Sequence, residues 1–365
     1  MKTVSVNLGL DYVFIIPGSI KPDWDNKLKA RVGLIKNNHK DCNVHLILHL
    51  NKEHYDWVKL DEYFIPMINK IMDECNITEF HYVFHLIESN YVFTSSKNIL
   101  CVDYYAMQTY RLVIEKQHPY NEQWNTNADK GLFLIGKPNK MNRLPILYHM
   151  YKNKLLDKFE WSLHLNDDIV HTIKKSGILA PYATDDEILT FLKECSRVSP
   201  DNAVVDFRGS NDDATVHYSG FPFDPNMYKN TLFSLIAETD FNDYSNPYIT
   251  EKTWRVIVNK HPFIMASTVN SLKYLKSLGF RTFEQYLPVK DYDSIVNNND
   301  RLNAIHDNLF GFFDNDNIEQ INIDVEYNFE HFKKFALGEF AKLESIYKSN
   351  PVELARFLID VAGYR

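Results

Sequence analysis

The sequence predicts an α/β fold in which helices cover two mostly parallel sheets, with further helices at the C-terminal end. Three observations lead to this prediction. Apolar runs of strand length alternate with helical patterns up to Lys116. The same alternation begins again at Gly131, after a polar stretch at 118–130 that has no periodicity. A chain of 365 residues that is 45% hydrophobic can also bury two separate cores.

Four short apolar runs in the N-terminal half are predicted to be buried strands. Helices are predicted over 60–74 and 105–116, because apolar residues recur there at helical spacing. The predicted strands are residues 12–17, 44–49, 81–85 and 98–102.

The C-terminal half repeats the pattern with longer connections. A strand at 131–136 is followed by a helix at 144–156 and a strand at 159–165, and residues 166–230 are predicted to be rich in loops. The later elements are strands at 231–237 and 261–267 with a helix between them, a helix at 269–278, and terminal helices at 329–347 and 352–361.

These elements divide the chain into four predicted parts. An N-terminal Rossmann-like domain, 1–122, is followed by a linker, 123–130, and by a second Rossmann-like domain, 131–328. The C-terminal helices, 329–365, are expected to pack back towards the N-terminal domain. The two domains are expected to face a cleft.

The charge distribution argues against strong non-specific binding to nucleic acid, because the formal net charge is −8. Segment 21–40 is a local exception, with six Lys or Arg residues against Asp23 and Asp25. A solvated amphipathic helix explains this segment. The alternative is a basic patch that meets an anionic acceptor, including nucleic acid.

The four cysteines are scattered in or near apolar stretches, without a CxxC pair, which indicates reduced and buried thiols. The N-terminus lacks the pattern of a signal peptide, and no apolar run approaches the length of a membrane span. We therefore expect a cytoplasmic protein, in the host cytoplasm if the chain is viral, without a membrane span.

The stretch 246–255, Asn-Pro-Tyr-Ile-Thr-Glu-Lys-Thr-Trp-Arg, carries the strongest functional signal. It predicts a helix that starts just beyond the carboxyl end of a strand, with Thr250 as the cap. Backbone N–H groups and the helix dipole make such an end an anion site. Glu251 and Lys252 in the first turn are then suited to ribose hydroxyls and phosphate.

A second segment, 131–143, runs from a strand through a polar loop to Arg143. Arg143 and Lys252 are expected at the same edge if both strands belong to one parallel sheet. Two cations and a helix end together suit a diphosphate, whose charge increases as it leaves during a transfer reaction.

The residues from Glu238 to Lys252, which end in Tyr-Ile-Thr-Glu-Lys, resemble the donor-binding segment of fucosyltransferases of glycosyltransferase family 10. The resemblance implies the GT-B fold of two Rossmann-like domains. It also implies that Arg143 and Lys252 contact donor phosphate, that Glu251 binds ribose hydroxyls and that Tyr248 forms a wall of the donor pocket.

Within that segment Glu238 matches the family pattern near base and ribose, whereas Thr239 and Asp240 replace Asn and Ser. The guanine preference of the fucosyltransferases is therefore not carried over. Residues 279–309 extend the resemblance to uncharacterised glycosyltransferases of phages and large viruses, and an abundance of Tyr, Phe, Asn, Lys and Ile fits such AT-rich genomes. The resemblance implies that domain 131–328 binds the nucleotide sugar and that domain 1–122 lies on the acceptor side, although the N-terminal half carries no recognised motif.

Inverting transfer needs a general base, which in this architecture comes from a strand end of the first domain. Glu88 and Asp103 are the candidates, and Asp11 is a third choice. We interpret the strand histidines as core residues. They are His45, His49, His81 and His85.

No metal or cofactor is expected beyond the nucleoside-diphosphate sugar donor, because Arg143 and Lys252 supply the positive charge. Several acidic pairs are instead interpreted as solvated loops or helix caps, although hard cations bind such carboxylates. They are Asp167–Asp168, Asp212–Asp213 and Asp291–Asp293.

The sequence thus predicts a hexosyl- or pentosyltransferase that moves a sugar to an acceptor hydroxyl, with inversion and without metal. The acceptor is expected to be a glycan. One alternative is a phage DNA-modifying enzyme that acts on 5-hydroxymethyl-pyrimidine DNA, where the base must be flipped or reached through a groove. The other is a non-catalytic nucleotide-binding protein that has kept the fold.

Overall fold

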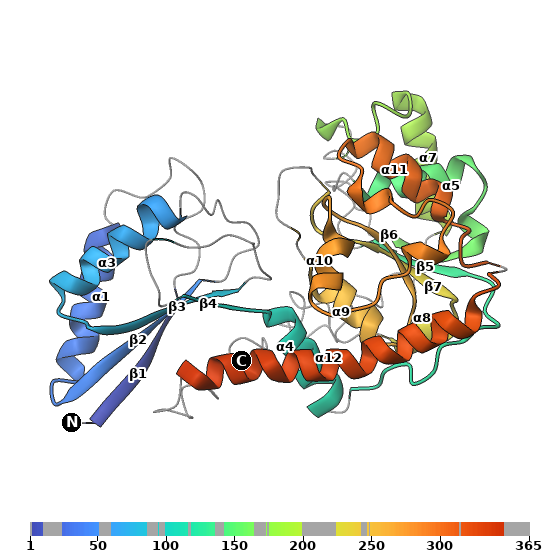
Figure 1. Cartoon of the computed structure of the whole chain (residues 1–365). Coiled ribbons are helices and arrows are strands. Elements are labelled where there is room, and N and C mark those ends of the chain that lie inside the picture. Colours follow the sequence, from blue (N-terminus) through green and yellow to red (C-terminus); the bar gives the residue numbers. More distant parts are fainter. Residues whose placement is uncertain are drawn as a thin grey trace. The chain divides into compact units, whose positions relative to one another are not determined.

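The computed structural model describes residues 2–9, 24–50, 60–85, 94, 99–115, 118–135, 142–163, 173, 175–198, 224–241, 247, 249–313 and 315–346. The chain forms two compact units, one of Met1–Met107 with Ala336–Arg365 and the other of Gln108–Phe335. Each unit contains a four-stranded sheet whose neighbouring strands are parallel (Figure 1). The predicted α/β class is confirmed.

The sheet of the first unit has the strand order β1-β2-β3-β4. Its strands are β1 (Lys2–Gly9), β2 (Cys42–Leu50), β3 (Glu79–His85) and β4 (Ile99–Val102). The last three match predicted strands, but β1 was not predicted, although apolar and polar residues alternate along 3–8. The strand predicted at 12–17 lies outside the described residues.

Two helices of the first unit, α1 (Trp24–Asn38) and α3 (Ile65–Glu74), lie side by side (Figure 1). The buried residues of α3 recur at helical spacing, at Ile65, Ile68, Ile71 and Met72. A π-helical turn, Leu60–Phe64, precedes α3, so this segment is helical from residue 60 to residue 74 as predicted.

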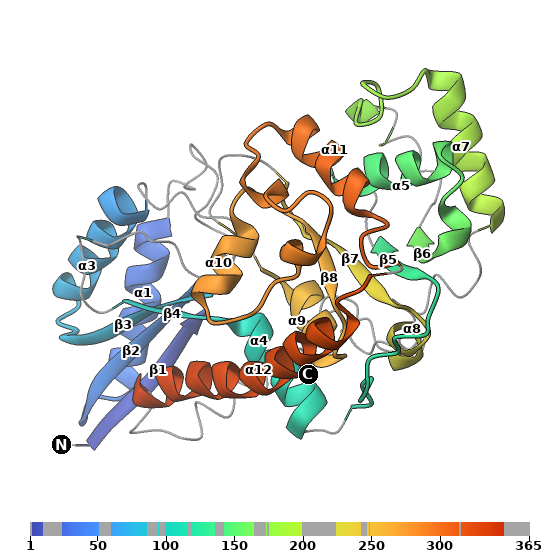
Figure 2. The same cartoon turned by 45° about the vertical axis from the view of Figure 1, so that its right-hand side comes forward.

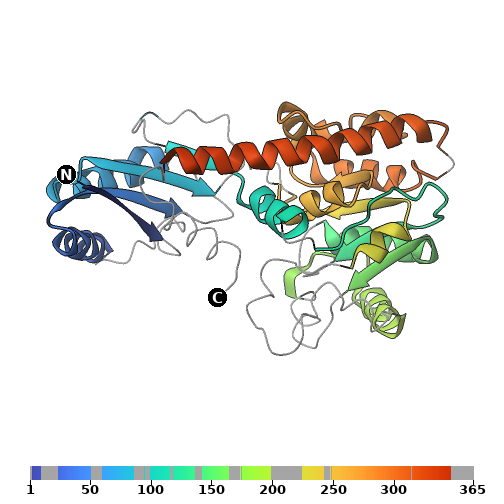
Figure 3. The ribbon, with the colours of Figure 1, turned by 90° about the horizontal axis from the view of Figure 1, so that it is seen from below.

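After β4 the chain continues into α4 (Tyr104–Tyr110) and a π-helical turn, Arg111–Glu115. The last long helix, α12 (Ile318–Ile346), is uninterrupted (Figure 3) and starts 11 residues before the predicted position 329. Leu343 and Ile346 near its end are buried in the core of the first unit with three residues of that unit: Val83, Val102 and Met107. The helix predicted at 352–361 lies outside the described part of the chain.

The sheet of the second unit has the order β6-β5-β7-β8. Its strands are β5 (Gly131–Ile135), β6 (Phe159–Leu163), β7 (Phe233–Ala237) and β8 (Phe263–Ala266). Every residue of β7 and β8 is buried, which explains why these strands are continuous apolar runs. Gly131 allows close packing, since a Cβ atom there would lie 2.5 Å from Cε1 of Phe159.

Helices cover both faces of this second sheet (Figure 2). Contacts place α11 against α5 and β8, and α9 against β7. Trp254 of α9 is fully buried and stacks on Phe335 of α12, with ring centroids 5.4 Å apart. The helices are α5 (Arg143–Lys152), α7 (Asp185–Val198), α8 (Pro225–Lys229), α9 (Glu251–Val258), α10 (Ser271–Ser277) and α11 (Asn298–Asn308). Among the described helices, none is long and apolar enough to cross a membrane.

The polar segment 118–130, which contains the predicted linker, belongs to the second unit. The backbone N–H of Asn121 donates to the Asn259 side chain at 2.8 Å, and the indole N–H of Trp124 donates to the carbonyl of Leu232 at 2.6 Å. In these two bonds a side chain satisfies a backbone group, once of the segment and once of the residues that it packs against. The division between the units accordingly falls after Met107 and not at 123–130.

Candidate functional site

The carboxyl edge of the second sheet gathers residues from three separate chain segments. Asn142 is fully buried at the start of α5, and its amide donates to the carbonyls of Glu238 at 3.1 Å and Ala266 at 2.8 Å. The Arg143 guanidinium donates to the carbonyl of Ala237 at 3.3 Å. The segment after β5 thus reaches the ends of β7 and β8, where Arg143 was expected.

Glu238 follows β7 directly and is 0% exposed. Its Oε1 accepts the backbone N–H of Thr250 at 3.0 Å and the hydroxyl of Thr253 at 2.6 Å, and its Oε2 accepts the hydroxyl of Thr250 at 2.5 Å. A carboxylate with several such donors can remain buried. The predicted ligand residue Glu238 therefore contacts the start of α9 and is closed to solvent in this conformation.

Thr250 caps α9, as its sequence position predicted. Its backbone is extended and its Oγ1 accepts the N–H of Lys252 at 3.3 Å. The ammonium of Lys252 lies 3.1 Å from the same oxygen and 2.8 Å from Oε1 of Glu251. The Lys252 and Glu251 side chains are 22% and 14% exposed, so a ligand can reach this ion pair.

Glu251 stays ionised beside Lys252. Burial raises the pKa of Glu251, but the attraction of Lys252 and Arg255 and the hydrogen bond from Lys252 outweigh burial, so the pKa lies below its ordinary value. The edge therefore presents a charged pair, one acceptor and one donor, to any ligand.

The first turn of α9 differs from the open anion site that the sequence suggested. Glu238 accepts the N–H of Thr250, and Thr250 accepts the N–H of Lys252. An incoming anion would therefore meet the Lys252 ammonium, two of whose three N–H groups are bonded to described residues.

Of the three predicted general bases, the structure describes only Asp103. Glu88 and Asp11 lie outside the described residues, as does Tyr248 of the predicted donor pocket. Asp103 is 2% exposed, and its Oδ1 accepts the N–H of Ala106 at 2.9 Å, so it caps α4. Its backbone N–H donates to Glu339, and burial raises its pKa well above the ordinary value. An acceptor hydroxyl does not reach this carboxylate in the present conformation.

One member of an acidic pair, Asp293, caps a helix, as interpreted from the sequence. Asp293 accepts the N–H groups of Leu272 at 3.0 Å and Lys273 at 3.1 Å, in the first turn of α10. Burial raises the pKa of Asp293 to about 6. The pairs at 167–168 and 212–213 lie outside the described residues. Across the part of the chain that the structure describes, no three His, Cys, Asp or Glu residues are grouped to hold a metal ion.

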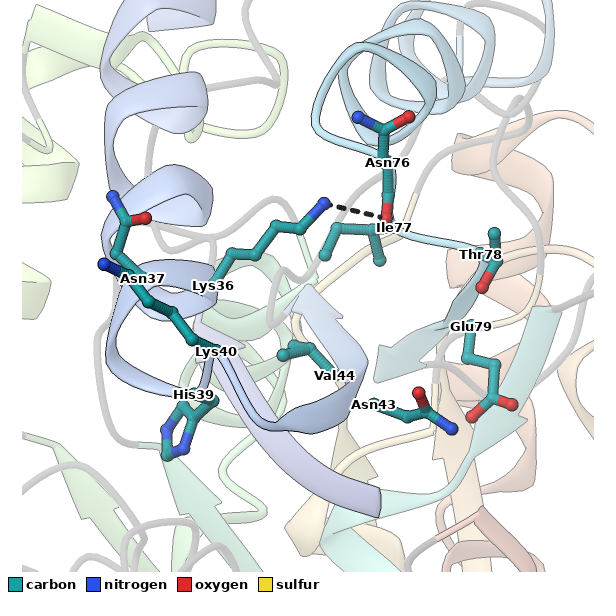
Figure 4. Close-up of a pocket in the computed structure, with 10 residues that line it drawn as sticks. All are labelled: Lys36, Asn37, His39, Lys40, Asn43, Val44, Asn76, Ile77, Thr78 and Glu79. Carbon is teal, nitrogen blue, oxygen red and sulfur yellow. Dashed lines mark hydrogen bonds between the residues drawn. The ribbon is translucent and has the colours of Figure 1, made fainter. Parts of the chain in front are cut away.

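The first unit has a cavity of ≈ 320 Å³ at the amino ends of β2 and β3 (Figure 4). Its charges are mixed, with Lys36 and Lys40 on one side and Glu79 on the other. The Lys36 ammonium donates to the carbonyl of Cys75 at 2.7 Å and thereby neutralises the C-terminal end of α3. Because ligands of such sheets bind at the carboxyl ends of the strands, we interpret this cavity as a depression of the surface and not as a ligand site.

Two members of the carboxyl-edge cluster were missed by sequence reasoning. Thr253 lies one helical turn after Thr250, so its position on the same face of α9 is a usable signal. Asn142 directly precedes Arg143 but lies 96 positions from Glu238, and no local pattern links the two.

Comparison with known proteins gives no match: no family model fits the chain, and no curated protein or solved structure is similar to it. The geometry of the carboxyl edge and the motif resemblance are therefore the basis for a functional assignment.

Proposed function

We propose that the chain is a glycosyltransferase of the GT-B type, which transfers a sugar from a nucleoside-diphosphate donor to a hydroxyl group with inversion and without metal. One observation carries the proposal. The partly exposed Lys252–Glu251 pair lies at the start of α9, at the carboxyl edge of a parallel sheet, next to the Arg143 segment. Nucleotides bind at this edge in doubly wound sheets.

The proposed chemistry follows from the charges at this edge. The Lys252 ammonium stabilises the negative charge that develops on the departing diphosphate, and the Glu251 carboxylate accepts hydrogen bonds from ribose hydroxyls. Arg143 is 4% exposed and donates to the carbonyl of Ala237, so in this conformation it adds positive charge to the edge without contacting the donor. Since Asp103 is committed to capping α4, we keep Glu88 as the first candidate for the general base and Asp11 as the second.

The test is a panel of nucleoside-diphosphate sugars with the wild type and Lys252→Met. We expect turnover with at least one donor and a loss of about a hundredfold in Lys252→Met. Lys260→Met is the matched control, because Lys260 lies past the other end of α9, where it pairs with Glu326 at 2.7 Å. Equal turnover in the wild type and Lys252→Met would refute the assigned site. Donor binding without turnover by the wild type would support the non-catalytic alternative.

For the acceptor we propose a glycan, with hydroxymethylated DNA as the second candidate. The DNA candidate is favoured by three exposed cations of segment 21–40: Lys27, Arg31 and Lys40. The same segment also uses cations structurally, since Lys29 pairs with Glu74 at 2.5 Å. Incubation with hydroxymethylated and unmodified duplexes, followed by nucleoside mass spectrometry, decides between them. No mass gain on modified DNA, with a donor that is turned over, removes the DNA candidate.

A further inference from the structure

The hydroxyl of Thr250 connects a buried carboxylate to an exposed cation. A threonine hydroxyl has one proton to donate and two lone pairs that accept. Thr250 Oγ1 donates to Glu238 at 2.5 Å and accepts from the N–H and the ammonium of Lys252 at 3.3 and 3.1 Å. Its hydrogen-bonding capacity is therefore completely used.

The direction of these bonds follows from Lys252, whose backbone N–H and ammonium can only donate. Thr250 accepts from both, so its single proton points towards Glu238. The lone pairs of Thr250 then face Lys252. A donor in place of the Glu238 oxygens would compete for the same lone pairs and turn the hydroxyl away.

We propose that Glu238 is a positioning residue that orients the Lys252 ammonium through Thr250, and that it does not contact the ligand itself. Its 0% exposure and its three bonds to Thr250 and Thr253 support this role. The benefit of the orientation rests on the proposed function, in which Lys252 stabilises the departing diphosphate. A cation that is already held in place loses less entropy when it binds.

A purely structural role for Glu238 predicts a different result. In that case loss of any bond to the carboxylate would loosen α9 and affect all neighbouring groups alike. The positioning role predicts an effect on Lys252 that passes through Thr250 and is absent when only the bond from Thr253 is lost.

The chemical reactivity of Lys252 is the main readout, because it needs no ligand. Each acceptor that holds the ammonium slows acylation, which requires the free amine lone pair. Glu238→Gln keeps the side-chain shape but introduces N–H donors. We expect Lys252 to be acetylated about fivefold faster in this variant, because its ammonium loses one hydrogen bond, that to Thr250. Mass spectrometry of limited acetylation gives this rate relative to Lys260 in the same molecule.

Two further variants make the test decisive. Thr250→Val removes the intermediate hydroxyl and should accelerate Lys252 acetylation as Glu238→Gln does, whether or not Glu238→Gln folds. Thr253→Val removes only the bond from the Thr253 hydroxyl to Glu238 and should leave the rate unchanged. Near-UV circular dichroism, to which the buried Trp254 contributes, shows whether the aromatic side chains remain packed. An unchanged Lys252 rate in folded Glu238→Gln or Thr250→Val, or an equal increase in Thr253→Val, would overturn the proposal.

Nucleotide binding separates this inference from the proposed function. Calorimetric titration with ADP, CDP, GDP, UDP and dTDP should show that Glu238→Gln weakens binding about tenfold, the size of one charge-assisted bond. In a Lys252→Met background the same substitution should have no further effect, and an equal loss there would contradict positioning. If the wild type binds no nucleoside diphosphate, the proposed function fails, whereas the acetylation result still decides the role of Glu238.

Discussion

Replacement of Thr253 by valine removes one hydroxyl group and keeps the size and branching of the side chain. Thr253 and Glu238 are both 0% exposed, and the hydroxyl donates to the carboxylate at 2.6 Å. Without it, the buried Glu238 carboxylate loses one of its three hydrogen bonds, and water does not replace the lost donor.

The expected cost follows from the charge of the acceptor. A hydrogen bond to a charged group contributes about 1.5 to 3 kcal/mol, and the added methyl of valine offsets only part of this. We therefore expect Thr253→Val to lower the free energy of unfolding by about 2 kcal/mol. In a unit of this size that corresponds to a fall in Tm of about 4 to 8 °C.

A second buried threonine provides the control. Thr282 is 2% exposed, and its hydroxyl makes no hydrogen bond with any residue that the structure describes. Thr282→Val should therefore be neutral or stabilising, because it removes a buried hydroxyl that has no such partner. Both variants are compared with the wild type by urea titration followed by tryptophan fluorescence. A cost below about 0.5 kcal/mol for Thr253→Val, or equal costs for the two variants, would refute the account of the Glu238 cluster.

Three further predictions concern packing and protonation. Burial lowers the pKa of His306 to about 3, so the free energy of unfolding should fall as the pH drops from 6.5 towards 3, by up to about 1.4 kcal/mol per pH unit. Urea titrations of His306→Phe at several pH values should show a weaker dependence on pH. Gly131→Ala should lower the free energy of unfolding by about 1 to 3 kcal/mol, because the added Cβ overlaps Phe159. Gly33→Ala should stabilise helix α1, because a Cβ there meets nothing within 4 Å, and equal melting temperatures of the two variants would contradict the packing. Burial raises the pKa of Asp103, so the contribution of this carboxyl to folding stability decreases as the pH rises. At pH 7 Asp103→Asn should be at least as stable as the wild type, whereas Asp103→Ala should lose about 1 kcal/mol because α4 loses its cap. A large loss of stability in Asp103→Asn would show that the charge itself is needed.

Much of the second unit could be predicted from the sequence because its signals are local. The apolar runs 231–237 and 261–267 contain β7 and β8, and Thr250 caps α9 as its position indicated. The start of α12 was placed too late, since only the part from 329 onwards was assigned to a helix. Local periodicity identifies helices and strands more reliably than their ends.

The roles of individual acidic residues could not be predicted in the same way. Glu238 and Asp103 both follow a strand in the sequence, where ligand-binding and helix-capping acids look alike. The structure gives both of them internal partners, at Thr250 and Ala106 respectively. Polarity alone also suggested a linker at 123–130, although Trp124 bonds to the carbonyl of Leu232.

By itself, the sequence determined the cap at Thr250, which depends on residues within a few positions of one another, and the α/β class with parallel strands, which the alternation of strand and helix patterns indicates. Only the tertiary structure decided that Glu238 is buried against α9 while Lys252 and Glu251 remain partly exposed. Burial and hydrogen-bond partners depend on segments far apart in the chain, such as Asn142 and Ala266, which are adjacent only after the sheet has formed.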